Sequence, residues 1–179
     1  RKTPPAKPKA SKPKPILANV DFFKTWSLEM AYVLGYFAAD GCMFSNPRGS
    51  YYIEFTSTDR ELIESVSVAM KAQQVIAHRP QLNPRWQDKY VLCMGSKVAF
   101  YDLLLLGFTP RKSKTLRLPD IPNDYLNGFV RGYFDGDGSV VFKDYYRKNS
   151  NSFQKFFFFI FTSGSRVLLE ELFIALQKN

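Results

Sequence analysis

Two stretches decide the fold: residues 31–41 read AYVLGYFAADG and residues 128–138 read GFVRGYFDGDG. They are identical at six of eleven positions, with a constant offset of 97 residues. Unrelated helices rarely agree to this extent, so the pattern indicates an internal duplication. The chain is therefore predicted to consist of two related halves.

Small residues recur at every fourth position in both stretches, which places them on one face of each predicted helix. They are Ala31, Gly35 and Ala39 in the first stretch and Gly128, Gly132 and Gly136 in the second. Glycine inside a helix costs about 1 kcal/mol relative to alanine, and close packing of two helix backbones offsets that cost. We therefore expect the helices to pack against each other, with Gly35 and Gly132 at their interface. Packing of each helix against an ordinary sheet is the alternative.

Asp40 and Asp137 end the two predicted helices, each just before a glycine. A carboxylate there opposes the helix dipole, and parallel packing of the helices would bring the two carboxylates together. A bound divalent cation removes both conflicts, with carboxylates and the backbone carbonyls of Ala39 and Gly136 as hard oxygen ligands. Such a site favours activation of water against a phosphodiester. The alternative is that each aspartate simply forms an Asp-Gly turn.

The flanking sequence alternates between helical and strand patterns. The first half reads helix, two strands, helix, two strands, helix, with helices beginning after Ser27, Asp59 and Ser96. Strands are expected near 43–45, 51–57, 75–79 and 89–94. After a basic, proline-punctuated link over 110–122, a helix over 124–138, strands over 138–143 and 153–162, and a helix capped by Ser165 follow. The second half therefore lacks its last two strands and helix.

Both stretches resemble the signature motif of the LAGLIDADG homing endonucleases. The resemblance implies an α+β fold built from a pseudo-twofold pair of αββαββα halves, with the second half incomplete in this chain. It also implies that Asp40 and Asp137 are the metal-binding catalytic residues, one from each motif. The acid two positions earlier is present as Asp135 but replaced by Ala38 in the first copy. The domains are then a tail over 1–20, a first half over 21–115 and a second half over 116–179.

The segment Gly107-Phe108-Thr109-Pro110-Arg111-Lys112-Ser113-Lys114-Thr115-Leu116 is similar to a stretch that follows the first half in this family. A lysine there lies near the active centre, which implies a catalytic role for Lys112, with Lys114 as the alternative. A lysine beside the reacting phosphate stabilises developing charge. The competing interpretation is a solvated basic linker that touches phosphates.

The resemblance implies a saddle of two four-stranded sheets laid along the major groove of DNA. Alternation in the strands predicts which side chains face the groove, where they and bridging waters can read base edges. The candidate DNA-binding residues are Arg48, Tyr52, Glu54, Thr56, Arg79, Arg85, Lys89, Lys114, Arg147, Lys148 and Gln154. The run from Phe156 to Phe161 conflicts with this expectation, because a groove-facing strand should not be apolar on both sides.

Composition limits the classes of function. The formal net charge is +9, of which +6 lies in residues 1–15, a proline-rich basic segment expected to be a solvated linker or a phosphate-tracking arm. The cysteines, Cys42 and Cys93, are expected to be free thiols, and with a single histidine they do not make a zinc site. Neither a membrane span nor a signal peptide is apparent. The absence of an initial Met suggests a trimmed fragment.

These observations predict a site-specific, metal-dependent endonuclease that hydrolyses double-stranded DNA and serves in intron homing. The expected cofactor is Mg²⁺, or another divalent cation such as Mn²⁺ or Ca²⁺. The expected protein is a monomer with internal pseudo-symmetry, in the cytoplasm or an organellar matrix, with no membrane partner. The alternative is a DNA-binding regulator without cleavage or an intron maturase that binds RNA. An intein-embedded nuclease is disfavoured because no splice junction is visible.

Overall fold

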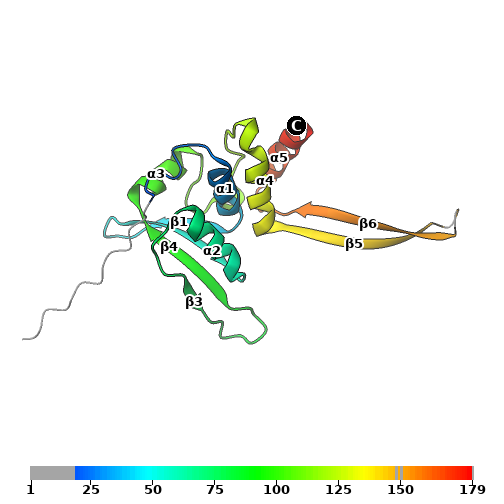
Figure 1. Ribbon diagram of the computed structural model, residues 1–179, viewed down its shortest axis with the longest axis horizontal. Helices are drawn as coiled ribbons and strands as arrows, with labels where there is room; N and C mark the ends of the chain where they lie inside the picture. The colour runs from blue at the N-terminus through cyan, green and yellow to red at the C-terminus, as the bar shows by residue number, and fades with distance from the viewer. Residues whose placement is uncertain (1–18, 148, 150, 179) are drawn as a thin grey trace, which may run out of the picture.

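The computed structural model describes residues 19–147, 149 and 151–178 (Figure 1). Its elements are α1 (Leu28–Asp40), β1 (Gly41–Ser45), β2 (Tyr51–Ser57), α2 (Arg60–Ala69), β3 (Ala77–Arg79), β4 (Lys89–Gly95), α3 (Lys97–Leu105), the 3-10 helix η1 (Lys112–Lys114), α4 (Asn123–Asp137), β5 (Gly138–Arg147), β6 (Ser152–Phe161) and α5 (Arg166–Lys178). The predicted α+β class and order of elements are confirmed. The 3-10 helix was not predicted, because the link before α4 reads only as basic and proline-rich.

The predicted helix caps form as expected. The Ser27 side chain accepts a hydrogen bond from the Met30 amide at 3.1 Å, and Asp59 accepts one from the Glu61 amide at 2.9 Å. Ser96 caps α3 in the same way. Each cap satisfies an amide that the first turn of a helix leaves unpaired, and typically contributes about 1 kcal/mol.

The first half is a four-stranded antiparallel sheet in the order β1-β2-β4-β3. Alternate residues of its strands, such as Ile53, Phe55 and Leu92, are buried in one core with α1, α2 and α3. The intervening residues lie on the opposite face, which no helix covers among the described residues. The candidate site lies where this face meets the C-terminal ends of α1 and α4.

Helices α1 and α4 pack side by side at the centre of the molecule (Figure 1). A β-carbon placed on Gly35 would lie 2.0 Å from the Phe129 carbonyl oxygen, and one on Gly132 would lie 1.9 Å from the Tyr32 carbonyl oxygen. The two contacts are equivalent, because the offset of 97 residues relates Tyr32 to Phe129 and Gly35 to Gly132. A β-carbon on Gly128 would likewise meet Ala31 at the start of the helices, and one on Gly136 would meet Ala39 at their end. The helices are therefore parallel and related by a local twofold axis.

The second half is the smaller of the two within the described residues. It consists of α4, the hairpin β5-β6 and α5, and the hairpin projects away from the other elements (Figure 1). Only Leu168 and Leu172 of α5 are buried. The aromatic run in β6 is exposed on both faces of the hairpin, as Phe158 and Phe159 illustrate, because no further strand or helix of the described residues covers it.

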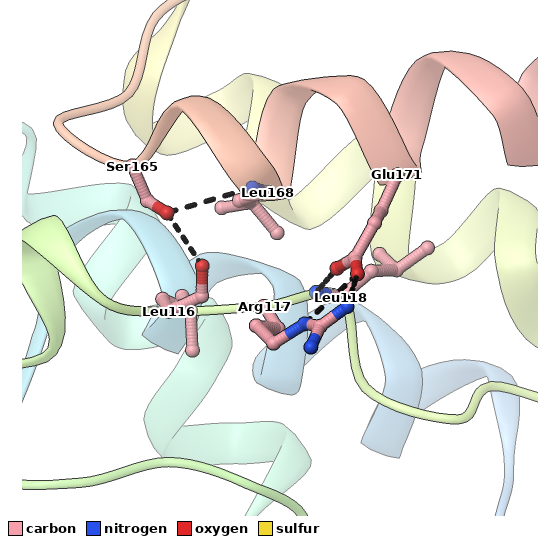
Figure 2. Close-up of polar contacts among 6 residues, drawn as sticks. All are labelled: Leu116, Arg117, Leu118, Ser165, Leu168 and Glu171. Atoms are coloured by element: carbon pink, nitrogen blue, oxygen red, sulfur yellow. Dashed lines mark hydrogen bonds and ion pairs between the residues drawn. The ribbon is translucent and has the colours of Figure 1, made fainter.

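The link between the halves is fastened to α5 (Figure 2). The Ser165 hydroxyl donates to the Leu116 carbonyl at 2.7 Å. The Glu171 carboxylate accepts from the Leu118 amide and from the Arg117 guanidinium, each at 2.9 Å. These contacts fix the chain that leads from η1 into α4.

None of the helices in the described part of the chain has both the length and the apolar character that crossing a membrane requires.

Candidate active site and DNA-facing surface

Asp40 and Asp137 lie together where α1 and α4 end. Near these ends the backbones are close, since a β-carbon on Gly136 would lie 2.4 Å from that of Ala39. Partial burial, followed by the negative charge of Asp137, raises the pKa of Asp40 to about 6. Burial also raises the pKa of Asp137. The two carboxylates are thus brought together in an arrangement that disfavours their charged forms.

Lys112 is the positive group beside this pair. Its side chain is only 6% exposed, and its Nζ donates to the Ala38 carbonyl at 2.9 Å. Burial lowers the pKa of Lys112 to about 8, and the charges of the two aspartates oppose that shift. An ammonium group is rarely buried without opposite charge nearby, so the aspartates make this position tenable. Lys114, the alternative lysine, is exposed at the other end of η1.

The backbone around η1 holds Lys112 in place. Arg111, just before η1, adopts a left-handed conformation with φ 63°, which turns the chain into the 3-10 turn. On the far side, Ser113 packs against the second half, where a β-carbon on Gly164 would lie 2.6 Å from the Ser113 carbonyl oxygen. Together with the contacts of Ser165 and Glu171 (Figure 2), this packing orients the lysine from both of its flanks.

The donor set at the helix ends is small. Within residues 19–147, 149 and 151–178, no group of three or more His, Cys, Asp or Glu side chains is placed to hold a metal ion. Two carboxylates nevertheless suit Mg²⁺, which commonly binds one or two protein carboxylates and completes its shell with water and phosphate oxygens. Burial and the negative charge of Asp137 raise the pKa of Asp40, and a bound cation would favour its charged form. The residues present therefore fit a divalent cation shared with a phosphate.

Asp135, the acid two positions before Asp137, is engaged elsewhere. Its carboxylate accepts a hydrogen bond from the Tyr32 hydroxyl at 2.9 Å across the helix interface and lies 3.9 Å from Arg131. The corresponding position in α1 is Ala38, whose carbonyl instead accepts from Lys112. The two motifs thus differ in sequence at this position and also in contact, since Asp135 binds Tyr32 whereas the Ala38 carbonyl binds Lys112.

The open face of the first sheet carries most of the DNA-binding candidates. Cα pairing aligns Cys42 with Glu54 and Glu54 with Cys93, and both cysteines are free. The Arg79 guanidinium contacts the Glu54 carboxylate at 3.2 Å. By strand alternation, this face also holds Tyr52, Thr56 and Lys89. Arg48 lies in the β1–β2 turn and Arg85 in the loop between β3 and β4.

This face adjoins the two aspartates. Asp40 is followed directly by β1, and the positive charge of Lys89 acts to lower its pKa. Cys42 is the first residue of β1 on the open face, and the positive charge of Lys112 acts to lower the pKa of its thiol. A duplex lying on this face would thus bring its phosphates toward the paired carboxylates.

In the second half, Arg147 and Gln154 lie on one face of the β5-β6 hairpin. Alternation places Phe156, Phe158 and Ile160 on that same face, so its part nearest α4 is apolar where the first sheet presents Tyr52 and Glu54. Lys148, also a candidate, lies outside the described residues.

The sequence contains a second repeat, which lies outside the two motif helices and was not predicted. Residues 55–69 read FTSTDRELIESVSVA and residues 161–175 read FTSGSRVLLEELFIA, identical at seven of fifteen positions with an offset of 106. This repeat explains equivalent anchors in the two halves. The Tyr36 hydroxyl donates to the Thr56 carbonyl at 3.0 Å, and the Tyr133 hydroxyl donates to the Thr162 carbonyl at 2.6 Å. Each motif helix is thereby tied to the second strand of its own half, at Thr56 in β2 and at Thr162 just after β6.

Comparison with known proteins agrees with this architecture. Residues 27–94 match the family of LAGLIDADG-like domains. No curated protein matches the chain in sequence.

Similar solved structures include I-DmoI in complex with DNA and Mn, with 16% identity and a TM-score of 0.48 over 89% of this chain and 78% of that chain. I-DmoI in complex with DNA and Ca has 16% identity and a TM-score of 0.47 over 89% and 73%. The LAGLIDADG meganuclease I-AabMI bound to uncleaved DNA has 12% identity and a TM-score of 0.43 over 73% and 66%.

Proposed function

We propose that the protein is a site-specific DNA endonuclease that hydrolyses both strands of a duplex, with one aspartate serving each strand. The observation that carries the proposal is the meeting of Asp40 and Asp137 at the ends of two parallel helices, with buried Lys112 beside them. The match of residues 27–94 to the family of LAGLIDADG-like domains supports the same conclusion.

In this mechanism the chain's own residues bind and orient the phosphates. The open face of the first sheet lies along the major groove, with Arg79 held by Glu54 and Lys89 toward the aspartates. When bound, Mg²⁺ or a similar cation supplies Lewis acidity and lowers the pKa of water for attack on phosphorus. Asp40 and Asp137, with the Ala39 and Gly136 carbonyls as further candidates, would hold that cation.

Lys112 acts on the charge that develops at the phosphate. Its ammonium group is fixed by the Ala38 carbonyl rather than by a carboxylate, so its other protons remain available to an oxygen of the reacting group. Burial strengthens this interaction because little water competes for the same donors. Lys112→Met is expected to reduce cleavage at least about 100-fold, as removal of a preorganised donor does elsewhere, and to change DNA affinity little.

The test is selection from a library of random duplexes. The protein is incubated with the library and Mg²⁺, and the cut ends are sequenced. A defined site with double-strand breaks supports the proposal, and the doubly substituted Asp40→Asn, Asp137→Asn protein is expected to yield none. If the wild type retains a defined sequence without cutting it, the protein is a DNA-binding regulator of the same fold. Selective binding of RNA instead would indicate a maturase.

A further inference from the structure

The loop between β3 and β4, residues 80–88, extends beyond the end of the first sheet and holds two large apolar side chains in solvent (Figure 1). Trp86 is 66% exposed and Leu82 is fully exposed. Neither belongs to the core or to the side chains packed against it. Trp26, the other tryptophan, stacks instead on Tyr125 with ring centroids 6.1 Å apart. Packing among the described residues therefore gives no reason for a tryptophan at position 86.

Hydrogen bonds hold the backbone of this loop at its tip and at its base. At the tip, the Asn83 side-chain oxygen accepts from the Arg85 amide and the Asn83 carbonyl accepts from the Trp86 amide, each at 3.0 Å. At the base, the Asp88 carboxylate accepts from the Gln81 amide at 3.0 Å and so joins the two arms of the loop. A turn fixed in this way presents the indole ring outward, and it loses little conformational entropy when the ring is bound.

Basic side chains surround the exposed ring. Residues 79–89 contain Arg79, Arg85 and Lys89 against a single acid, Asp88, whose carboxylate is already engaged by the loop backbone. The loop therefore presents net positive charge. Cations beside an exposed aromatic ring suit a nucleic acid, because its phosphates attract the cations and its bases stack on the ring.

The loop continues the open face of the first sheet. Arg79 is the last residue of β3 and Lys89 the first of β4, and the two are paired across the strands at the base of the loop. Both lie on the open face, where Arg79 contacts Glu54 of β2 at 3.2 Å. A duplex on this face, which the proposed function requires, therefore passes from Arg79 and Lys89 to the tip of the loop and reaches Trp86.

We propose that Trp86 is a wedge that stacks on the bases of duplex DNA at the flank of the bound site. The ring enters between two neighbouring base pairs and partly unstacks them, as apolar side chains do in proteins that kink DNA. Arg85 binds a phosphate beside that step. Pyrimidine–purine steps unstack most easily, so Trp86 also gives the protein a preference for such a step at the flank. This inference rests on the proposed function in placing a duplex on the open face, but it does not require cleavage.

Two other partners could use a tryptophan beside an arginine. A protein surface is one, since both residues are common at the centres of protein interfaces. A single strand is the other, because its bases are already free to stack. A duplex is favoured over both because the cations at Arg79, Arg85 and Lys89 extend from the loop onto the open face of the sheet.

The first test follows the fluorescence of Trp86. The full chain with Trp26→Phe retains Trp86 as its only tryptophan. A mixed-sequence duplex of about 30 base pairs, or about three helical turns, is added at low salt without divalent cations, so that no strand is cut. Stacking is expected to quench the emission and to protect the ring from acrylamide. The difference in emission between the wild type and Trp86→Phe gives the same signal without a change at Trp26.

The second test compares two neighbouring variants by the salt dependence of duplex binding. Trp86→Ala is expected to weaken binding at least about fivefold, the lower limit for loss of one base–aromatic stack, and to leave the salt slope unchanged because the ring has no charge. Arg85→Gln is expected to reduce the slope by about one phosphate contact. Trp26→Phe is the control and should bind like the wild type.

The outcomes separate this inference from the proposed function. It is overturned if Trp86 emission is unchanged at saturation with duplex, if Trp86→Ala binds like the wild type, or if the separated strands bind more tightly than the duplex. Quenching by a protein that never cuts DNA would uphold the wedge and contradict the endonuclease. Cleavage with an unquenched Trp86 would do the reverse, and absence of any duplex binding would contradict both.

Discussion

Gly132 in α4 is the position at which a single methyl group should do most damage. The Gly132→Ala side chain would begin 1.9 Å from the Tyr32 carbonyl oxygen, 2.8 Å from the carbonyl carbon and 2.9 Å from the Tyr36 amide nitrogen. All three atoms are backbone atoms of α1, so no rotation of a side chain relieves the overlap. The helices themselves must move apart.

The size of that movement follows from the geometry. A carbon approaches a carbonyl oxygen to about 3.3 Å, so α1 and α4 must separate by about 1.4 Å at this point. A gap of 0.5–1 Å already removes a quarter to a half of the dispersion attraction between facing atoms. We expect a loss of about 3 kcal/mol or more at the interface, against a gain of about 1 kcal/mol in helix propensity. The free energy of unfolding should fall by about 2 kcal/mol or more.

Urea denaturation of the wild type, Gly132→Ala and Gly128→Ala measures this difference. Gly128 is the matched control on the same helix face, since its new β-carbon would lie 2.9 Å from the Leu28 carbonyl oxygen and 3.2 Å from the Ala31 β-carbon. The overlap at Gly128 is relieved by a shift of about 0.4 Å at the helix start, against about 1.4 Å at Gly132, so Gly128→Ala should lose less stability than Gly132→Ala. Equal stability of the two variants would refute the packing account.

Three further predictions concern the same helices. Gly136→Ala should be destabilising alone but rescued by Ala39→Gly, because the 2.4 Å overlap joins the two β-carbons; urea denaturation of both single variants and the double variant would measure the coupling. Tyr36→Phe should cost about 1 kcal/mol by the same assay, because it removes the hydrogen bond to the Thr56 carbonyl. Without divalent cations, stability should fall as pH rises from about 4 to about 6, because folding raises the pKa of Asp40 from 3.8 to about 6; a pH series on Asp40→Asn should show a shallower fall.

The helices and their caps were predictable because their signals are local. A serine or aspartate followed by apolar residues at helical spacing specifies a helix start within one turn, as at Ser27 and Asp59. The repeated motif, with its offset of 97 residues, also predicted which two helices resemble each other. Their mutual packing was also predicted, because close backbone contact offsets the cost of glycine at positions such as Gly35.

Other features were not predictable because they depend on residues far apart in the chain. The burial of Lys112 depends on Ala38, 74 positions earlier, and on the packing of Gly164 against Ser113. The ion pair between Glu54 and Arg79 depends on the strand order, in which β4 rather than β3 adjoins β2. Periodicity within one strand contains no information about either arrangement.

The most direct test of the central claim compares three single variants on a DNA site recovered by selection. Asp40→Asn and Asp137→Asn remove one carboxylate each from the helix ends, and Asp135→Asn alters a carboxylate that faces Tyr32 instead. Double-strand cleavage and DNA affinity are measured with Mg²⁺. The account predicts that each of the first two variants loses at least about 100-fold in double-strand cleavage while binding is retained, and that Asp135→Asn still cuts. Undiminished double-strand cleavage by either Asp40→Asn or Asp137→Asn would contradict it.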